Sequence, residues 1–225
     1  MERFFDVIFS SIALILLSPL LVVVVLLLRF SGEGEIFFYQ DRIGMRGRVF
    51  KLYKFATMQK NSPNIGSGTV TMKDDPRILP LGRYLRKTKI NELPQLLNIL
   101  FGDMSIIGPR PMTLQTFSFY SVEIQEILNT VRPGLSGVGS IIFRNEEEIM
   151  HGTTASLDFY INSIAPYKGK LEQWFASNKG IRIYFLAIFI TAWTLVFPST
   201  KIAWTFFRDL PVPPSELKQS LNYND

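Results

Sequence analysis

The chain has 225 residues, a formal net charge of +5 at pH 7 and no cysteine. This length suits one domain with a hydrophobic core and attached membrane elements, and it is too short for two large domains. The lack of cysteine excludes disulfide bonds, a thiolate nucleophile and a cysteine-based zinc site.

The positive charge is concentrated in one part of the chain. Residues 29–100 contain thirteen Lys or Arg residues and six Asp or Glu residues. Such a surface suits anionic lipid head groups or a phosphate-rich substrate better than a neutral partner. The charge would also suit nucleic acid, but the sequence has no helix-turn-helix, zinc-finger or aromatic RNA-binding signature. We therefore expect no nucleic acid partner.

The first expected element is a membrane helix. Residues 7–28 form a run of 22 residues without a charge. As a helix they would be about 33 Å long, enough to cross the hydrocarbon core of a bilayer. A cleavable signal peptide is the alternative, but the start Met-Glu-Arg is not net basic and no small-x-small cleavage site follows the run. The run therefore ties the domain to a membrane.

The pair Ser18-Pro19 lies near the middle of this run. Proline removes a backbone donor and clashes with the preceding turn, so a kink is expected there. The run is then either a kinked transmembrane helix or a re-entrant helix that enters and leaves by the same leaflet. In the second case Ser18 and neighbouring protein satisfy the carbonyl groups that the proline frees. Hydropathy does not separate the two.

The next elements are expected to form a two-stranded hairpin. Residues 36–39 are apolar and strand-like, and the polar cluster with a glycine at 40–44 indicates a turn. Residues 49–55 alternate in the manner of a half-exposed strand. Further on, Arg83, Arg86 and Lys87 are spaced to share one helix face. That face would hold phosphate, lie on anionic lipid head groups or be solvated.

The segment Asn91-Glu92-Leu93-Pro94 has the composition of a helix start. Asparagine is among the best N-cap residues, glutamate favours the first turn, and proline is tolerated there. The simplest interpretation is a well-capped helix that ends near Gly102. This interpretation explains Asn91, but it leaves unexplained the basic face before it and the Gly-Pro-Arg-Pro sequence at 108–111 after it.

These surroundings indicate a diphosphate site. A helix N-terminus offers unpaired backbone N–H groups to an anion. Arg110, held between two prolines, is a pre-positioned fork for phosphate oxygens, and Glu92 is a ligand for a hard cation such as Mg²⁺. Asp103 is a second carboxylate here, with local backbone donors as its alternative partners.

The C-terminal half is expected to be helical at 117–131, with close backbone approach at the glycines that follow. A second apolar run, at 181–197, is interrupted only by Arg182. We expect an interfacial or partly inserted helix there, with a second membrane span and a buried core helix as alternatives. Residues 210–225 contain three prolines and no periodic apolar face, which predicts a flexible tail.

Motifs along residues 1–180 match one family in order and spacing. They are Gln40-x-Arg42-x-Gly44, Tyr53-Lys54-Phe55-x-Thr57-Met58, Asp75-Pro76-Arg77, Gly82-Arg83-x-x-Arg86-Lys87, Glu92-Leu93-Pro94-Gln95-Leu96-x-Asn98, Gly102-Asp103-Met104-Ser105, Gly108-Pro109-Arg110-Pro111 and Val131-Arg132-Pro133-Gly134. The chain thereby resembles the bacterial sugar transferase family, the monotopic phosphoglycosyl transferases.

The resemblance implies an activity. The family moves a sugar 1-phosphate from a nucleotide diphosphate sugar to a polyprenyl (undecaprenyl) phosphate and releases a nucleoside monophosphate, with Mg²⁺ and a covalent phosphosugar-aspartate intermediate. The reaction is the first membrane step of a bacterial surface polysaccharide or glycoconjugate pathway, at the cytoplasmic face of the inner membrane. The implied partners are both substrates and membrane lipids, and a homodimer is an open alternative.

The resemblance also assigns roles to residues. Asn91 stands at the nucleophile's position, where the family has aspartate, and Glu92 corresponds to the metal-binding acid. The implied phosphate and substrate contacts are Arg110, Arg86, Arg42, Arg132 and Arg144. A neutral amide is a poor nucleophile, so two hypotheses stay open. In one, Glu92, another carboxylate or the polyprenyl phosphate itself attacks; in the other, a silenced or substrate-trapping relative binds without turnover.

The expected fold is α+β and mainly helical, with interfacial amphipathic helices. The family places Ser-Pro pairs such as Ser18-Pro19 in a re-entrant helix with both ends cytoplasmic. The expected organisation is a re-entrant membrane helix at 1–30, a cytoplasmic catalytic domain at 31–180, an apolar interfacial or inserted helix at 181–209 and a flexible tail at 210–225.

Overall fold

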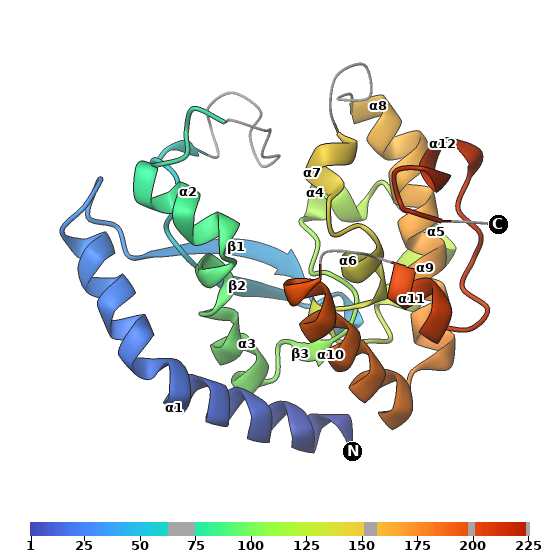
Figure 1. The fold of residues 1–225 in the computed structure, drawn as a ribbon, viewed down its shortest axis with the longest axis horizontal. Coiled ribbons are helices and arrows are strands. Elements are labelled where there is room, and N and C mark those ends of the chain that lie inside the picture. Colours follow the sequence, from blue (N-terminus) through green and yellow to red (C-terminus); the bar gives the residue numbers. More distant parts are fainter. Residues whose placement is uncertain (63–74, 151–156, 198–200, 224–225) are drawn as a thin grey trace.

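The computed structural model describes residues 1–62, 75–150, 157–197 and 201–223. Its α-helices are α1 (Glu2–Arg29), α2 (Pro80–Lys87), α3 (Gln95–Phe101), α4 (Leu114–Phe117), α5 (Val122–Leu128), α6 (Val138–Ile142), α7 (Glu146–Ile149), α8 (Leu157–Phe159), α9 (Ala165–Asn178), α10 (Ile181–Val196), α11 (Lys201–Phe206) and α12 (Ser215–Lys218). The strands are β1 (Phe37–Ile43), β2 (Val49–Phe55), β3 (Ser105–Ile107) and β4 (Gly134–Ser136). The predicted α+β, mainly helical class is confirmed (Figure 1).

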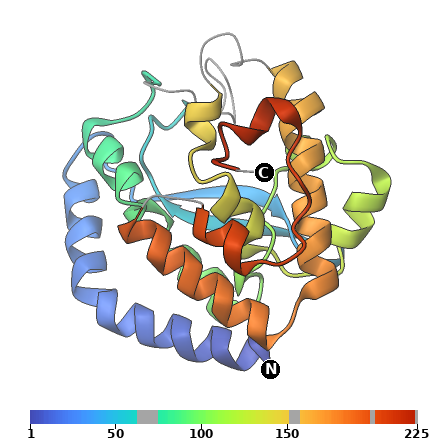
Figure 2. The ribbon, with the colours of Figure 1, turned by 45° about the vertical axis from the view of Figure 1, so that its right-hand side comes forward.

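Helix α1 is long and apolar enough to cross a membrane. Figures 1 and 2 show that it bends partway along its length, and Pro19 lies inside it. Proline cannot donate to the carbonyl of Ile15, four residues earlier. The hydroxyl of Ser18 donates to that carbonyl instead, at 2.8 Å. The expected role of Ser18 in satisfying a freed carbonyl group is therefore confirmed.

One side of α1 packs against the protein along both arms of the bend. Leu14 and Leu17 contact the cluster around Ile99, and Val24 and Leu28 are buried beside Phe55. The opposite side is bare and apolar. Its exposed residues are Ile12, Ile15, Leu16, Leu20, Val22, Val23, Leu26 and Leu27. The helix is thus attached to the domain and presents apolar surface outward.

Strands β1 and β2 form the predicted antiparallel hairpin, with Phe37 opposite Phe55 and Ile43 opposite Val49. The turn prediction at 40–44 was wrong for most of its length, because β1 continues to Ile43. The polar residues there alternate in and out of one sheet face and so fit a strand. The reversal falls instead in the short 3-10 turn η1 (Met45–Gly47).

The helix predicted from Asn91 begins later than expected. A 3-10 turn, η3 (Ile90–Glu92), comes first, and α3 follows with Pro94 at its N-cap. Gly102 ends α3 with φ of 96°, a left-handed conformation that glycine adopts without strain. The predicted end of the helix is therefore confirmed, and its predicted start is wrong.

Helix α3 lies against the free edge of β2. The side-chain amide of Asn98 accepts from the backbone N–H of Tyr53 at 3.0 Å and donates to the carbonyl of Lys51 at 2.8 Å. Asn98 therefore replaces a neighbouring strand at that edge. It also donates to a carboxylate oxygen of Asp103 at 3.3 Å, so the partner of Asp103 seen here is a side-chain amide and not the backbone donors given as its alternative.

Strands β3 and β4 are parallel, with Ser105 opposite Gly134. Between them the chain was expected to be helical throughout 117–131. It instead forms two short helices, α4 and α5, separated near Ser121. At the break Ser118 donates to the carbonyl of Gln115, and Ser121 is the extended N-cap residue of α5. Such local side-chain hydrogen bonds and cap residues compete with a continuous helix.

The main core lies between α6, α9 and α10. Helix α10 buries Tyr184, Ala187 and Ile190 in this core, and Figure 2 shows it alongside the N-terminal part of α1. Its outer face is apolar and exposed, with Phe185, Phe189, Trp193, Leu195, Val196 and Phe197. At 16 residues it falls short of the roughly 20 needed to cross a bilayer. The helix combines a core face with a bare apolar face.

The segment expected to be a flexible tail packs onto the core. Leu217 of α12 and Leu221 are 0% and 1% exposed and belong to the main core cluster. Trp204 donates to the carbonyl of Leu221, and Tyr167 donates to that of Pro211. The sequence showed too few apolar residues for a periodic face, yet two leucines one helical turn apart suffice to fix the segment.

Candidate functional site

The alternation of the hairpin brings several polar side chains to one face. Gln40 and Arg42 of β1 point to the same side as Lys54 of β2, because side chains two residues apart share a face and the register places position 38 opposite 54. Arg42 donates to the side-chain oxygen of Gln40 at 2.5 Å. Two cations therefore converge on the face of the hairpin that looks toward the Gly-Pro-Arg-Pro corner.

The corner at 108–111 is fixed by backbone hydrogen bonds on both sides. Gly108 donates to the carbonyl of Ser136 and Gly134 donates to that of Pro109. A Cβ atom on Gly108 would lie 2.3 Å from the carbonyl oxygen of Arg132, so only glycine fits. On the other side Arg42 donates to the carbonyl of Pro111 at 2.8 Å. The backbone that carries Arg110 is therefore held in place.

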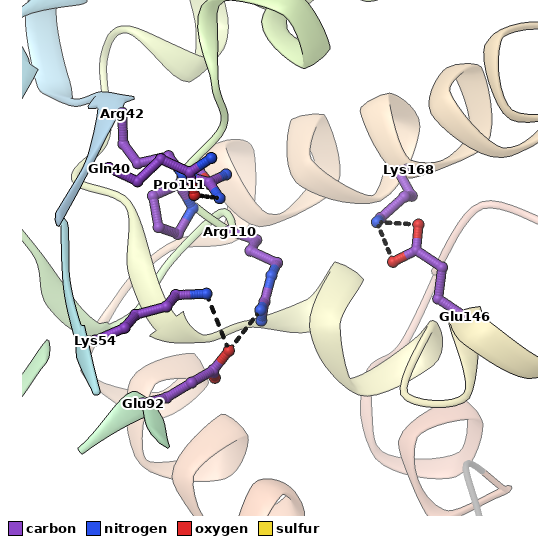
Figure 3. A network of polar contacts seen from close by, with 8 residues as sticks. All are labelled: Gln40, Arg42, Lys54, Glu92, Arg110, Pro111, Glu146 and Lys168. Carbon is purple, nitrogen blue, oxygen red and sulfur yellow. Dashed lines mark hydrogen bonds and ion pairs between the residues drawn. The ribbon is translucent and has the colours of Figure 1, made fainter. Parts of the chain in front are cut away.

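Glu92 is the centre of the site. Its Oε1 accepts from Nη2 of Arg110 at 2.8 Å and lies 3.5 Å from Nζ of Lys54 (Figure 3). The Glu92 side chain is 14% exposed. Burial would raise the pKa of this carboxyl, but Arg110, Lys54 and Lys89 together hold it below its usual range. Glu92 is thus a carboxylate at every physiological pH.

Burial lowers the pKa of the two cations on the hairpin, whereas it acts to raise the pKa of Glu92. Burial lowers the pKa of Lys54 to about 8, although Glu92 opposes the shift. Burial, together with the charge of Arg110, lowers the pKa of Arg42 to about 10. Both groups remain cationic at neutral pH, and the surplus of positive charge around one carboxylate suits an anionic ligand.

Asn91 does not act as a helix cap. It lies in η3, makes no capping hydrogen bond and is 5% exposed. Its side-chain oxygen is buried without a hydrogen-bond partner within the described part of the chain. A buried unpaired amide oxygen costs about 1–3 kcal/mol. The interpretation of Asn91 as a cap is therefore wrong, and its oxygen is available to a ligand.

The other predicted arginines have different surroundings. Arg86 lies half-buried on α2 within electrostatic reach of Lys54. The Nε of Arg132 donates to the carbonyl of Gly102 at 3.2 Å, a structural contact with the end of α3. Arg144 is half-buried after α6, and its contacts with the Glu92 group are not seen within the described ranges. The structure therefore groups Arg42 and Arg110 with Glu92 and sets Arg132 apart.

A second polar cluster lies across from Arg110 (Figure 3). Lys168 of α9 contacts both carboxylate oxygens of Glu146 at 2.9 Å. Burial lowers the pKa of Lys168, but Glu146 more than compensates, so the pKa is raised. One turn further along α9, burial raises the pKa of Glu172 to about 7. Gly139 accommodates this carboxyl, because a Cβ there would lie 2.2 Å from its Oε1.

Sequence reasoning missed Lys54, Gln40, Lys168, Glu146 and Glu172 as members of polar clusters. Strand alternation could have placed Lys54 beside Arg42, because both belong to predicted hairpin strands. The spacing of Lys168 and Glu172 places them on one helix face. Their approach to the site depends on how α9 packs, which no local pattern predicts.

Whether this site can hold Mg²⁺ depends on the oxygen ligands near Glu92. In the part of the chain that the structure describes, no group of three or more His, Asp or Glu residues is placed to hold a metal. Mg²⁺ is commonly held by one or two carboxylates together with substrate phosphates and water. Glu92 and the unpaired oxygen of Asn91 fit that limited donor set. A site completed by substrate is compatible with these residues.

Comparison with known proteins gives the family. The sequence profile described as bacterial sugar transferase matches residues 1–197. A long apolar N-terminal helix, an α+β domain and a cationic site around one carboxylate accompany this match. The chain belongs to the bacterial sugar transferase family.

Individual relatives agree with this assignment. The exopolysaccharide production protein ExoY of Sinorhizobium fredii is 39% identical over 171 residues, covering 70% of this chain and 74% of the relative. ExoY of Rhizobium meliloti is 36% identical with the same coverage. The UDP-glucose:undecaprenyl-phosphate glucose-1-phosphate transferase of Escherichia coli is 32% identical over 84% of this chain, which spans 39% of that longer protein.

Proposed function

We propose that the chain transfers a sugar 1-phosphate from a nucleotide diphosphate sugar to undecaprenyl phosphate, as an early step in making an exopolysaccharide or related glycoconjugate. The observation that carries the proposal is the placement of Arg110 and Lys54 on Glu92, with Arg42 nearby. The positively charged side chains suit the oxygens of a diphosphate, and the single carboxylate suits its metal ion. Family membership and the names of several relatives support the same reaction.

In this reaction a phosphate oxygen of the lipid attacks the phosphorus that carries the sugar. The bond from that phosphorus to the bridging oxygen breaks, and the nucleoside monophosphate leaves with the bonding electron pair. Charge develops on the oxygens of the transferring group, so fixed cations are the main contribution that a protein can make. Arg110 and Lys54 would bind those oxygens, and Arg42 would hold the corner that carries Arg110.

The identity of the attacking group depends on Asn91 and Glu92. Asn91 is neutral, and Glu92 is engaged by two cations that lower its basicity. Neither is a good nucleophile. We therefore favour direct attack by the lipid phosphate over a covalent intermediate on the enzyme. Intact mass measured after addition of sugar nucleotide alone is expected to show no phosphosugar adduct, and an adduct on Glu92 would contradict this step.

For Mg²⁺, we propose Glu92 and the side-chain oxygen of Asn91 as protein ligands. The ion would supply positive charge to the diphosphate oxygens. The protein's own contribution is to present a carboxylate of low pKa and an amide oxygen without a partner at the same turn. The amide binds the ion more weakly than a second carboxylate would.

For the membrane, we propose that α1 is re-entrant, with both ends at the cytoplasmic face of the inner membrane, and that α10 lies at the interface. Two observations support this. Helix α1, which contains Pro19, bends along the surface of the domain, and Ser18 donates to the Ile15 carbonyl that the proline leaves without a backbone donor. The exposed apolar faces of α1 and α10 would both lie in the lipid.

The test is release of nucleoside monophosphate from a panel of nucleotide diphosphate sugars, with Mg²⁺ and undecaprenyl phosphate. The chain is expected to turn over one of them, and Glu92→Gln is expected to abolish release. Asn91→Asp restores the family's usual acid and serves as the matched variant. Release by Asn91→Asp alone, with none from the native chain, would instead identify a silenced relative that binds substrate.

A further inference from the structure

One oxygen of Glu92 receives both cations of the site. Its Oε1 lies 2.8 Å from Arg110 Nη2 and 3.5 Å from Lys54 Nζ. Figure 3 shows the two side chains reaching this carboxylate from two different elements, the Gly-Pro-Arg-Pro corner and strand β2. In this structure the carboxylate proposed to bind Mg²⁺ is therefore neutralised by the side chains proposed to bind the diphosphate.

A divalent cation cannot bind well to this carboxylate while two cations occupy it. The repulsion between like charges a few ångströms apart in a partly buried site is large compared with thermal energy. The same cations are needed by the diphosphate. Moving them from Glu92 to a phosphate would satisfy them and release the carboxylate at the same time.

We propose that the contact of Arg110 with Glu92 is a latch that keeps the metal-binding carboxylate closed until a diphosphate draws Arg110 away. The latch rests on the proposed function and adds an order of ligand binding to it. The chain alone binds the metal weakly, and the diphosphate and the metal bind cooperatively. Because linkage is reciprocal, the metal must raise the affinity for diphosphate by the same factor.

The two cations differ in their freedom to move. The Arg110 side chain is 44% exposed, whereas that of Lys54 is 19% exposed. The corner backbone is fixed by the hydrogen bonds of Gly108 and Gly134, so an exchange of partners by Arg110 is a movement of its side chain and not of the backbone. Arg110 is therefore the moving part of the latch, and Lys54 is the less mobile of the two cations.

The experiment is a titration of the full chain, in detergent and without nucleotide, with Mn²⁺ followed by electron paramagnetic resonance. The native chain is expected to bind weakly. Arg110→Gln keeps the side-chain length similar and removes the charge, and it is expected to tighten Mn²⁺ binding about tenfold, within the usual range of coupling. Arg110→Gln combined with Glu92→Gln is expected to lose this gain. Unchanged Mn²⁺ affinity in Arg110→Gln would overturn the latch.

The matched control is Lys51→Gln. Lys51 pairs with Asp41 on the outer face of the hairpin and is 61% exposed, so its loss changes net charge equally without touching the site. Its Mn²⁺ affinity is expected to equal that of the native chain. A tightening as large as that of Arg110→Gln would show a general charge effect and overturn the latch. Thermal unfolding of each variant checks that the fold is retained.

The reciprocal arm measures protein-bound inorganic diphosphate by equilibrium dialysis, with and without Mg²⁺. Mg²⁺ also binds diphosphate in solution, so the native chain is compared with Glu92→Gln. The latch predicts a larger gain from Mg²⁺ in the native chain, and an equal gain in both would contradict it. Neither arm uses turnover. If the enzyme is active but metal and diphosphate binding are not coupled, only the latch is overturned. If the two are coupled but the enzyme does not turn over, only the proposed reaction is overturned.

Discussion

The phenol hydroxyl of Tyr184 donates to Oδ1 of Asp6 across 2.8 Å and thereby joins α10 to the first turns of α1. The same carboxylate oxygen accepts from the hydroxyl of Ser105 at 3.0 Å and from the backbone N–H of Ile106 at 2.9 Å. Asp6 is 1% exposed. One buried carboxylate thus holds the apolar helix α1, strand β3 and α10 together.

Asp6→Ala is expected to destabilise the protein by about 3 kcal/mol or more, because it leaves two buried hydroxyls and the half-buried N–H of Ile106 without an acceptor. Tyr184→Phe removes only one of these hydrogen bonds and is expected to cost about 1.5 kcal/mol. Thermal unfolding in detergent measures both. Equal losses in the two variants would show that Asp6 contributes through Tyr184 alone and not as a three-way junction.

Lys54 predicts a pH dependence of substrate binding. Its pKa is lowered to about 8 by burial, so the cation is present below that pH and is lost as the pH rises through it. The KM for nucleotide sugar is expected to rise above pH 8. Lys54→Arg, which keeps the charge, is expected to move this rise to higher pH, whereas Lys51→Arg is expected to leave it in place. A flat KM between pH 7 and 9 would contradict the assignment.

Glu172 predicts a pH dependence of stability. Burial raises its pKa to about 7, whereas the unfolded chain releases this proton near pH 4.3. Between these values the folded state binds more protons, so stability falls as the pH rises, by about 4 kcal/mol in total. Glu172→Gln is expected to be more stable than the native chain at pH 8 and to lose that advantage at pH 4.5. If the stability of Glu172→Gln and that of the native chain vary with pH in parallel, this explanation is contradicted.

The Ser18-Pro19 pair predicts the topology of α1. Single cysteines placed before residue 7 and after residue 28 are expected to react with a membrane-impermeant reagent from the same side. Pro19→Ala restores the backbone donor to the carbonyl of Ile15 and is expected to straighten the helix. The two positions of that variant would then label from opposite sides. Opposite-side labelling in the native chain would exclude a re-entrant helix.

Much of the local structure follows from short-range patterns. The charge-free run predicted α1, strand alternation predicted the hairpin, and Gly102 marked the end of α3. The helix start at Asn91 was wrong for a physical reason. Good capping composition does not compel a cap when Pro94, three residues on, can begin the helix itself.

The site residues likewise divide into those whose contacts the sequence predicted and those whose contacts it did not. Arg110 and Glu92 were expected to act together, and the structure places them 2.8 Å apart. Arg132 belongs to the same run of motifs, yet it contacts Gly102. Spacing along the chain cannot distinguish an arginine aimed at a substrate from one aimed at a helix end, because the direction of each depends on the packing of separate elements.

The sequence by itself determined the long apolar helix, the polar corner and the family, because hydrophobic length, proline and glycine positions and motif order are local properties of a chain. Only the tertiary structure decided that Lys54 joins Arg110 on one oxygen of Glu92, that the oxygen of Asn91 is buried without a partner, and that Asp6 meets Tyr184. These relationships join residues from 18 to 178 positions apart. They arise only when the hydrophobic effect brings distant elements into one core.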